Sequence, residues 1–247
     1  MTKLTGKVLV TSGGTQGIGE AIALLAAENG AAGVVITGRQ EAKGQAVVER
    51  INARGAQGLF VAADLSSVDD CRNVIQQCDA TFGRVDALVN AAADTNRGTI
   101  ESTTPEFWDY QFHVNVRAPF LLSQQLAGDL EAAGGAIVNI VDVYAEKPLA
   151  GHPLYCMAKA GLAMMTKSLA RELGPAVRVN GVSPGAILWP EQGQENQQAI
   201  LDATALGRAG DPDDIAATVA WLALEAPYIT GQILAVDGGR SLSFPGG

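Results

Sequence analysis

The sequence has few cysteines and histidines and a deficit of basic residues, and each shortage excludes a class of function. Its three cysteines, Cys71, Cys78 and Cys156, are an odd number and have no metal-ligand spacing. The two histidines, His113 and His152, do not cluster with other ligand types, so we expect reduced thiols and no metal site. The formal net charge of -9 argues against a nucleic-acid partner, because phosphates would be repelled.

Long apolar runs and targeting segments are also missing. No run approaches the ~20 apolar residues that a membrane-spanning helix needs, and no basic amphipathic segment suggests binding to a membrane surface. The opening residues, MTKLTGKVLV, contain no signal-peptide hydrophobic region. We therefore predict a cytoplasmic protein without a membrane partner.

The 247 residues contain no linker, repeat or low-complexity tract that would divide them. An apolar fraction of 47% and a charged fraction of 17% suit a well-buried core. Because α/β folds often reach ~250 residues as one domain, we predict a single domain over residues 1–247.

Short Val/Ile-rich runs alternate with helix-forming runs along the whole chain. This alternation predicts a parallel sheet with helices on both faces, a doubly wound three-layer α/β sandwich. Seven strands are expected, at residues 7–12, 33–37, 58–63, 86–90, 135–141, 177–182 and 232–236. Helices are expected at residues 17–29, 40–54, 67–82, 105–132, 153–174 and 212–224.

A glycine-rich turn joins the first strand to the first helix. Glycine permits positive φ and lets backbone N–H groups approach a pyrophosphate at the helix start, although an ordinary βα turn is the alternative. The candidate cofactor residues in this turn are Ser12, Gly13, Thr15, Gln16, Gly17, Ile18 and Gly19.

The second strand is followed by Gly38 and Arg39. An acidic residue at this place would bind the ribose 2′-hydroxyl of NAD, whereas glycine and arginine leave room and charge for a 2′-phosphate. We predict NADP(H) as the cofactor, with a solvated surface arginine as the alternative.

Tyr155 and Lys159 are four residues apart, so they share one face of the helix predicted at 153–174. An ammonium beside a phenol favours phenolate and is expected to lower the Tyr155 pKa below its usual ~10. Asp142 precedes Tyr155 by thirteen residues. A carboxyl group in an apolar pocket is expected to have a raised pKa, so both residues are candidate acid–base groups.

Ligands in doubly wound sheets bind at the carboxyl ends of the strands. The candidate residues follow the predicted strands at those ends: Gly13–Gly19, Arg39, Asp64, Asn90, Asp142 and Gly185. Residues 186–206 include a polar stretch, EQGQENQQ, after an apolar start with Trp189. This segment is either a lid over the substrate or a surface loop.

The chain resembles the short-chain dehydrogenase/reductase family over essentially its whole length. The resemblance is carried by SGGTQGIG at 12–19, Asp64-Leu65, NAAA at 90–93, Asn115, Tyr155-x-x-x-Lys159, RVNGVSPG at 178–185 and YITGQILAVDGG at 228–239. It implies a Rossmann-type fold, a nicotinamide cofactor and hydride transfer. The helices at 105–132 and 153–174 are similar to those that pack family tetramers, which implies a homotetramer; burial inside the monomer is the alternative.

The resemblance also implies roles for individual residues. Tyr155 would be the acid/base, Lys159 would bind the nicotinamide ribose and lower the Tyr155 pKa, and Asn115 would hold a water in a proton relay. Asp64 would contact adenine. Further cofactor contacts are expected from Leu65, Asn90, Ala91, Ala92, Pro184, Gly185 and Ile187. Substrate contacts are expected from Asp142, Tyr155, Asp94 and Trp189.

Asp142 is the largest departure from the family pattern, because most members carry a serine there. An aspartate at this place is similar to the pteridine reductases of the family, in which Asp and Tyr together deliver a proton to a C=N bond. Two pterin-holding features of that group are missing: its glycine-loop arginine is replaced by Gly17, and its stacking aromatic residue aligns with Thr95.

Three functions follow from this pattern. The first is an NADPH-dependent reductase of a small planar C=N or C=O substrate, with pterins first. The second is a general ketone reductase or alcohol dehydrogenase. The third is a non-catalytic NADP(H)-binding protein, against which the Tyr155, Lys159 and Asn115 set argues.

Overall fold

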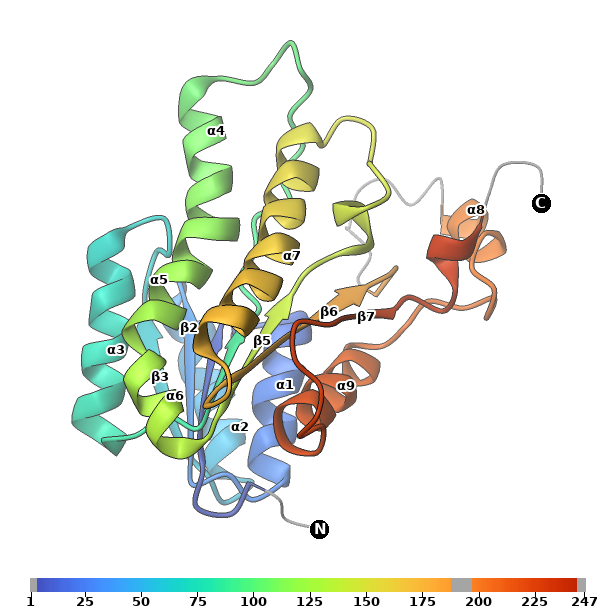
Figure 1. Cartoon of the computed structure of the whole chain (residues 1–247). Helices are drawn as coiled ribbons and strands as arrows, with labels where there is room; N and C mark the ends of the chain where they lie inside the picture. The colour runs from blue at the N-terminus through green and yellow to red at the C-terminus, as the bar shows by residue number, and fades with distance from the viewer. Residues whose placement is uncertain (1–3, 188–196, 244–247) are drawn as a thin grey trace.

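Seven parallel strands form one sheet in the order β3-β2-β1-β4-β5-β6-β7 (Figure 1). The computed structural model describes residues 4–187 and 197–243. The strands are β1 (Val8–Ser12), β2 (Gly33–Gly38), β3 (Gln57–Ala62), β4 (Ala87–Asn90), β5 (Ala136–Ile140), β6 (Arg178–Pro184) and β7 (Ile233–Val236). The predicted seven-stranded, doubly wound α/β fold is confirmed. Strand β6 runs past its predicted end at residue 182, because Pro184 still pairs in register with Val236.

Helices cover both faces of the sheet, as Figure 1 shows. Alternate strand residues face opposite sides: Leu9 of β1 packs into one apolar core, and Val8 and Val10 pack into the other. The first core is closed by α1 (Gly17–Glu28), α2 (Glu41–Asn52) and α9 (Pro212–Leu224). The second is closed by α3 (Val68–Phe82), α5 (Ala118–Gln125), α6 (Ala127–Ala133) and α7 (Pro153–Leu173).

The single helix predicted at 105–132 is wrong, because this stretch forms four consecutive pieces. They are α4 (Pro105–Phe112), the π-helical turn η1 (His113–Arg117), α5 and α6. The break between α5 and α6 falls at Leu126, where ψ is -1° and the side chain is buried beside Leu122 and Leu130. Composition favours a continuous helix here, and Leu126 N and Leu130 N still donate to the carbonyl groups four residues earlier, so the break is a local distortion.

Three short elements were not predicted: η2 (Val143–Ala145), α8 (Gln197–Asp202) and η4 (Arg240–Leu242). Helix α8 lies within the segment proposed from sequence as a lid or loop. Residues 188–196 of that segment, including the predicted substrate residue Trp189, are outside the described residues. The lid therefore stays a prediction.

Several large apolar side chains on α4, α5 and α7 are exposed in the monomer. Trp108 is 41% exposed, Phe120 43% and Met164 62%. Burial inside the monomer therefore does not account for all of their apolar surface, and the homotetramer stays a prediction. Within the described residues, no helix combines the length and apolar character needed to cross a bilayer.

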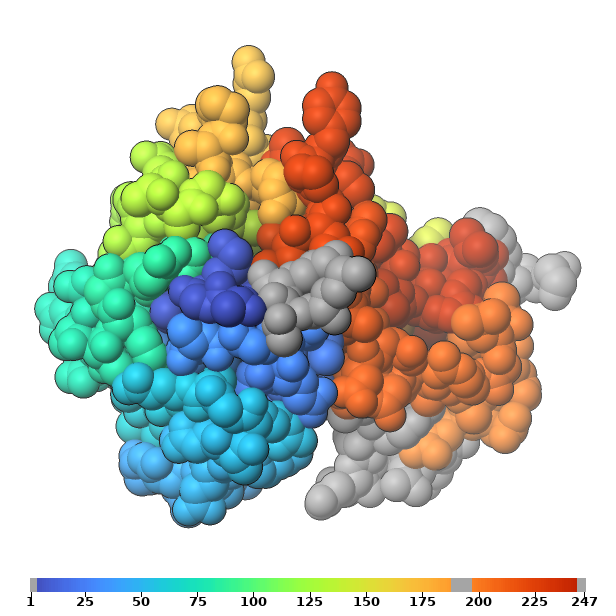
Figure 2. Space-filling model, turned by 90° about the horizontal axis from the view of Figure 1, so that it is seen from below, coloured from blue at the N-terminus to red at the C-terminus, as the bar shows by residue number. Residues whose placement is uncertain are grey.

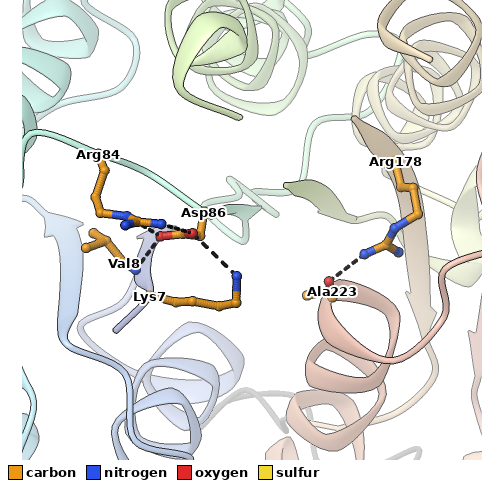
Figure 3. Close-up of polar contacts among 6 residues, drawn as sticks. All are labelled: Lys7, Val8, Arg84, Asp86, Arg178 and Ala223. Carbon is orange, nitrogen blue, oxygen red and sulfur yellow. Dashed lines mark hydrogen bonds and ion pairs between the residues drawn. The ribbon is translucent and has the colours of Figure 1, made fainter. Parts of the chain in front are cut away.

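The amino ends of β1 and β4 are joined by contacts to the buried carboxyl group of Asp86 (Figure 3). Asp86, just before β4, accepts hydrogen bonds from Val8 N at 2.9 Å and from Arg84 Nη2 at 2.7 Å. Burial alone would raise the pKa of Asp86, but the hydrogen bonds from Arg84 and Val8 outweigh it and hold the pKa below its usual value. Lys7 adds a third contact at 3.5 Å.

Arg178 makes a similar anchor at the start of β6. Its guanidinium donates to Ala223 O at 2.6 Å (Figure 3). It also donates to Ala226 O at 3.1 Å, so it satisfies carbonyl groups at and just after the end of α9. Seen from below, the dark blue start of the chain lies between the green segments and the orange-to-red segments (Figure 2). The contacts of Asp86 and Arg178 thus lie at the amino ends of the strands. Ligands of doubly wound sheets bind at the opposite edge, where the carboxyl ends of the strands lie.

Candidate active site

The loops after β1 and β4 touch at the point where the strand order reverses. A Cβ on Gly13 would lie 2.6 Å from Ala92 Cα, and Gly13 has a φ of +71°, so only glycine fits there. Ser12 closes the same junction, since its Oγ accepts hydrogen bonds from Ala91 N at 3.1 Å and Ala92 N at 3.2 Å. These contacts place the glycine loop at the crevice where doubly wound sheets bind ligands.

Helix α1 begins beside this loop without a side-chain cap. Its N-cap residue, Gln16, makes no capping hydrogen bond and instead accepts one from Lys43 Nζ at 3.2 Å. A Cβ on Gly19 would lie 2.3 Å from Gly13 O, so the first turn packs directly on the loop. Uncapped N–H groups at a helix start bind phosphate, and this cradle fits the predicted pyrophosphate.

Two cations lie close to the end of β2. Arg39 follows the strand, and its Nη1 donates to Tyr110 Oη at 3.2 Å. Lys43 lies in the first turn of α2 and contacts Gln16 of the glycine loop. Neither cation forms an ion pair with another described residue. Both are therefore available for charge-assisted hydrogen bonds to the predicted 2′-phosphate.

Asn115 lies within the π-helical turn and is tied to the segment after β4. Its Oδ1 accepts from Asp94 N at 3.3 Å, and its Nδ2 donates to Asp94 O at 3.1 Å and Gln111 O at 3.0 Å. π-helical turns occur frequently at functional sites. The Nδ2 group is thus used inside this network, and the water in the predicted proton relay stays a prediction.

The Asp94 side chain belongs to the same network. Its carboxyl accepts hydrogen bonds from Gln111 Nε2 and from Asn96 Nδ2. Burial raises the pKa of Asp94, while the Asn96 hydrogen bond and the charge of Arg39 act in the opposite direction. These contacts group Asp94 with the Arg39 end of the site. None of its described hydrogen bonds reaches Asp142 or Tyr155, and its contact with substrate stays a prediction.

Asp142 and Tyr155 meet at the carboxyl end of β5. Tyr155, in the first turn of α7, donates from its hydroxyl to Asp142 Oδ2 at 2.7 Å. The other carboxyl oxygen of Asp142 accepts from Tyr144 N at 2.9 Å, which caps η2 and fixes the carboxyl group. Tyr155 is 5% exposed. The predicted acid–base pair is thus in direct contact.

The expected lowering of the Tyr155 pKa is wrong for this arrangement. Burial and the adjacent Asp142 carboxyl raise the pKa of Tyr155 well above its usual value. Lys159 Nζ lies 5.8 Å from the phenol ring centroid and donates instead to Ile140 O at 2.7 Å. Tyr155 therefore keeps its proton in the cofactor-free protein, as a proton donor must.

The pKa values of Asp142 and Lys159, the two charged groups beside Tyr155, are shifted mainly by burial. Burial raises the pKa of Asp142 and outweighs its hydrogen bonds and the charges of Lys159 and Arg240, so the expected raised pKa is confirmed. Burial lowers the pKa of Lys159 to about 8. Both groups are thereby brought toward neutral pH, where acid–base groups are most effective.

The other predicted cofactor residues lie at the same edge of the sheet. Asp64 accepts from Ser66 N at 2.9 Å after β3, and Asn90 donates to Asn139 Oδ1 at 2.8 Å at the end of β4. A Cβ on Gly185 would lie 2.7 Å from Asp237 Cα, so the chain after β6 packs closely on the chain after β7. Leu65, Ala91, Pro184 and Ile187 lie beside these residues in sequence, and their cofactor contacts stay predictions.

Four residues that the sequence analysis did not single out also face this edge. Lys43 had an available signal, because it lies in the first turn of the helix that follows Arg39. Tyr144 also had one, because it lies two residues after Asp142. Tyr110 and Arg240 had none, since only the tertiary fold brings them to Arg39 and Tyr144.

Comparisons with known proteins agree with this geometry. Residues 13–241 match the family model described as Enoyl-(Acyl carrier protein) reductase. The chain is 39% identical to a (2S)-[(R)-hydroxy(phenyl)methyl]succinyl-CoA dehydrogenase subunit of Thauera aromatica, over 96% of this chain and 97% of the relative. It is 35% identical to a 3-oxoacyl-[acyl-carrier-protein] reductase of Synechocystis sp., over 97% and 98% of the two chains.

The fold matches equally well. A short-chain dehydrogenase of Burkholderia cenocepacia solved with NADP superimposes with a TM-score of 0.90 at 36% identity, covering 96% of this chain and 99% of the other. The sequence motifs, the sheet order and the Asp142, Tyr155 and Lys159 geometry agree with these matches. The chain belongs to the short-chain dehydrogenase/reductase family.

Proposed function

We propose that this protein is an NADPH-dependent reductase in which the hydrogen-bonded pair of Asp142 and Tyr155 supplies the proton. The hydrogen bond of 2.7 Å from Tyr155 Oη to Asp142 Oδ2 carries the proposal. It joins a phenol that keeps its proton to a carboxyl group with a raised pKa. Together they form a proton store at the carboxyl end of β5.

The cofactor is NADP(H). The uncapped start of α1 and the glycines packed on Ala92 form a cradle that fits a pyrophosphate. Arg39 and Lys43 fit a 2′-phosphate, and no carboxylate stands at the end of β2. The structural relative from Burkholderia cenocepacia was solved with NADP.

Bound NADPH supplies the hydride, and the chain's own residues supply the remaining chemistry. Tyr155 Oη donates its proton to the oxygen or nitrogen of the reduced bond. Asp142, when protonated, returns a proton to Tyr155 through their hydrogen bond. Lys159 is held by Ile140 O at 2.7 Å, where its ammonium can donate to the cofactor ribose.

A carbonyl compound is the first substrate class. The names of the Thauera and Synechocystis relatives describe enzymes that interconvert a hydroxyl and a carbonyl group, which supports the same reaction in this chain. Reduction adds one hydride and one proton across the C=O bond and yields an alcohol. The uncharged phenol of Tyr155 is the donor that this step requires.

A C=N bond in a planar ring is the second class, and Asp142 favours it. A carboxyl with a raised pKa can deliver a proton to a ring nitrogen, which a serine hydroxyl cannot do at neutral pH. Pterins belong to this class. The residue at the usual stacking position is Thr95, which offers no aromatic ring; stacking contributes about 0.5–1.5 kcal/mol beyond burial.

The test is NADPH oxidation by the purified wild-type protein with a panel of ketones and, separately, with dihydrobiopterin. Faster turnover of ketones supports carbonyl reduction, and faster turnover of dihydrobiopterin supports the C=N class. Absence of turnover on both, in a protein that binds NADPH, would contradict the proposed function.

A further inference from the structure

A turn with two consecutive glycines, Gly238 and Gly239, follows β7 and places Arg240 near the Asp142 and Tyr155 pair. Asp237 accepts hydrogen bonds from Gly239 N at 2.9 Å and from Ser241 N at 2.7 Å, so its carboxyl is used inside the turn. Gly238 and Gly239 have φ values of +62° and +80°, which other residues rarely adopt. The two hydrogen bonds to Asp237 hold this turn, and the turn places Arg240 at the start of η4.

Arg240 is connected to Asp142 through Tyr144. Its Nη2 donates to Tyr144 Oη at 2.8 Å, and its guanidinium carbon lies 5.6 Å from the centroid of the Tyr144 ring. Tyr144 in turn donates its backbone N–H to Asp142 Oδ1 at 2.9 Å. Arg240 thus stands at one end of a series of contacts that runs through Tyr144 and Asp142 to the hydroxyl of Tyr155.

The positive charge of Arg240 has no carboxylate partner within the described residues. The nearest acid in sequence, Asp237, is occupied by backbone N–H groups, and no ion pair involves Arg240. Its described side-chain partner is a single phenol oxygen. A guanidinium has several donors in a planar fork that matches a carboxylate, so most of its capacity remains unused.

We propose that Arg240 binds a carboxylate carried by the substrate, so that the protein prefers oxo acids to neutral ketones; this rests on the proposed carbonyl reduction. The single positive charge of Arg240 matches the single negative charge of a carboxylate. A phosphate dianion would bring a second negative charge close to Asp142 with no cation to balance it. Tyr144 acts as a positioning residue, because its ring and hydroxyl hold the guanidinium in place.

Two other roles for Arg240 predict different results. A purely structural clamp between η4 and η2 would affect all substrates equally. The Arg240 charge also opposes the raised pKa of Asp142. If that were its only role, its removal would shift the pH profile for neutral and acidic substrates alike.

The experiment compares 4-oxopentanoate and 5-oxohexanoate with their methyl esters, using NADPH oxidation at constant ionic strength. We expect wild type to show a kcat/KM at least about tenfold higher for the acids. R240Q should lower kcat/KM for the acids by about 10- to 100-fold, mainly through KM, as expected for a hydrogen bond to a charged group. The esters report the share of the loss that comes from the Arg240 charge acting on Asp142, and their kcat/KM should fall by clearly less than that of the acids.

Matched variants separate charge from folding. R240K keeps the charge and should recover part of the preference for acids. Y144F should raise KM for the acids by a larger factor than KM for the esters. R171Q, at an exposed position in the last turn of α7, should change nothing. Equal activity of wild type on acids and esters would overturn the proposal, as would an equal loss on both in R240Q.

A binding measurement distinguishes this proposal from the proposed function. With NADP⁺ bound, pentanoate should raise the Tm of wild type more than pentanamide does, and R240Q should lose that difference. If no oxo compound is reduced but pentanoate still binds through Arg240, carbonyl reduction fails and the carboxylate site stands. If the esters are reduced and pentanoate gives no extra stabilisation, the carboxylate site fails and carbonyl reduction stands.

Discussion

The Tyr155 hydroxyl and the Asp142 carboxyl share a hydrogen bond of 2.7 Å between the start of α7 and the end of β5. Tyr155 is buried and Asp142 is half-buried, and each changes the proton affinity of the other. A serine at position 142 would offer a hydroxyl that holds a carbonyl but would have no titratable carboxyl group. The contact therefore couples the proton affinities of two residues.

Tyr155→Phe removes the hydroxyl and keeps the ring. We expect kcat to fall by about 10²–10⁴-fold, the usual contribution of a positioned acid. The Kd for NADPH, measured by fluorescence titration, should stay nearly unchanged. A variant with near wild-type kcat would contradict the role of Tyr155 as the acid.

Asp142→Ser and Asp142→Asn test what the carboxyl adds. Asn keeps the shape without a titratable proton, and Ser keeps only a hydroxyl. We expect both variants to lose reduction of dihydrobiopterin, and Asp142→Ser to keep ketone reduction. The measurement is kcat/KM for each substrate with each variant. A parallel fall in both activities would make Asp142 a general relay or structural residue.

Arg39→Ala should weaken NADPH binding by about tenfold or more, because hydrogen bonds to a phosphate are worth about 1.5–3 kcal/mol. NADH binding should barely change. Lys43→Ala should show the same selectivity with a smaller effect, since an ammonium lacks the planar fork with which a guanidinium binds phosphate. Arg72→Ala, which removes an exposed arginine paired with Asp69, is the matched control. Equal losses for both cofactors would show that these cations do not bind the phosphate.

The pKa of Lys159, which burial lowers to about 8, predicts a pH limit on activity. Below that pH the ammonium is charged and can bind the cofactor ribose; above it the charge is lost. We expect kcat/KM for reduction to decline above about pH 8. The arginine in Lys159→Arg stays charged at all accessible pH values. The variant should therefore lose the decline in kcat/KM above about pH 8, even if its kcat/KM is lower at every pH. If kcat/KM of the variant still declines above about pH 8, the titrating group is not Lys159.

Asp86→Asn should destabilise the fold by about 1–2 kcal/mol at neutral pH, since Asp86 receives charge-assisted hydrogen bonds but Arg84 is half exposed. The folded-state pKa of Asp86 is lowered, so its contribution is present above the unfolded pKa and is lost as pH falls through the folded value. The difference between wild type and variant should shrink toward about pH 3. Urea denaturation at both pH values measures it.

The control for that experiment is Asp69→Asn, because Asp69 forms an exposed ion pair with Arg72 and has an 87% exposed side chain. Its change in unfolding free energy should be near zero at both pH values. A loss at Asp69 as large as at Asp86 would point to net charge rather than to the buried contacts of Asp86.

The strands, most helices and the glycine loop were predictable because their signals are local. Val/Ile-rich runs and the spacing of Gly13–Gly19 act within a few residues, and the sheet order then carries Tyr155, Lys159 and Asp142 to one edge. The same signals failed over residues 105–132. Helix-forming composition continues there, and no local signal marks the π-helical turn or the break at Leu126.

The sequence by itself determined which chemical groups the site contains, and the tertiary structure decided how they behave. From spacing alone, Lys159 was expected to lower the Tyr155 pKa; in the fold, Asp142 and burial dominate and raise it. Arg240 lies close to Tyr144 although 96 residues separate them in sequence. Proton affinity and charge pairing depend on distance and on exclusion of water, and both are set only when distant segments pack together.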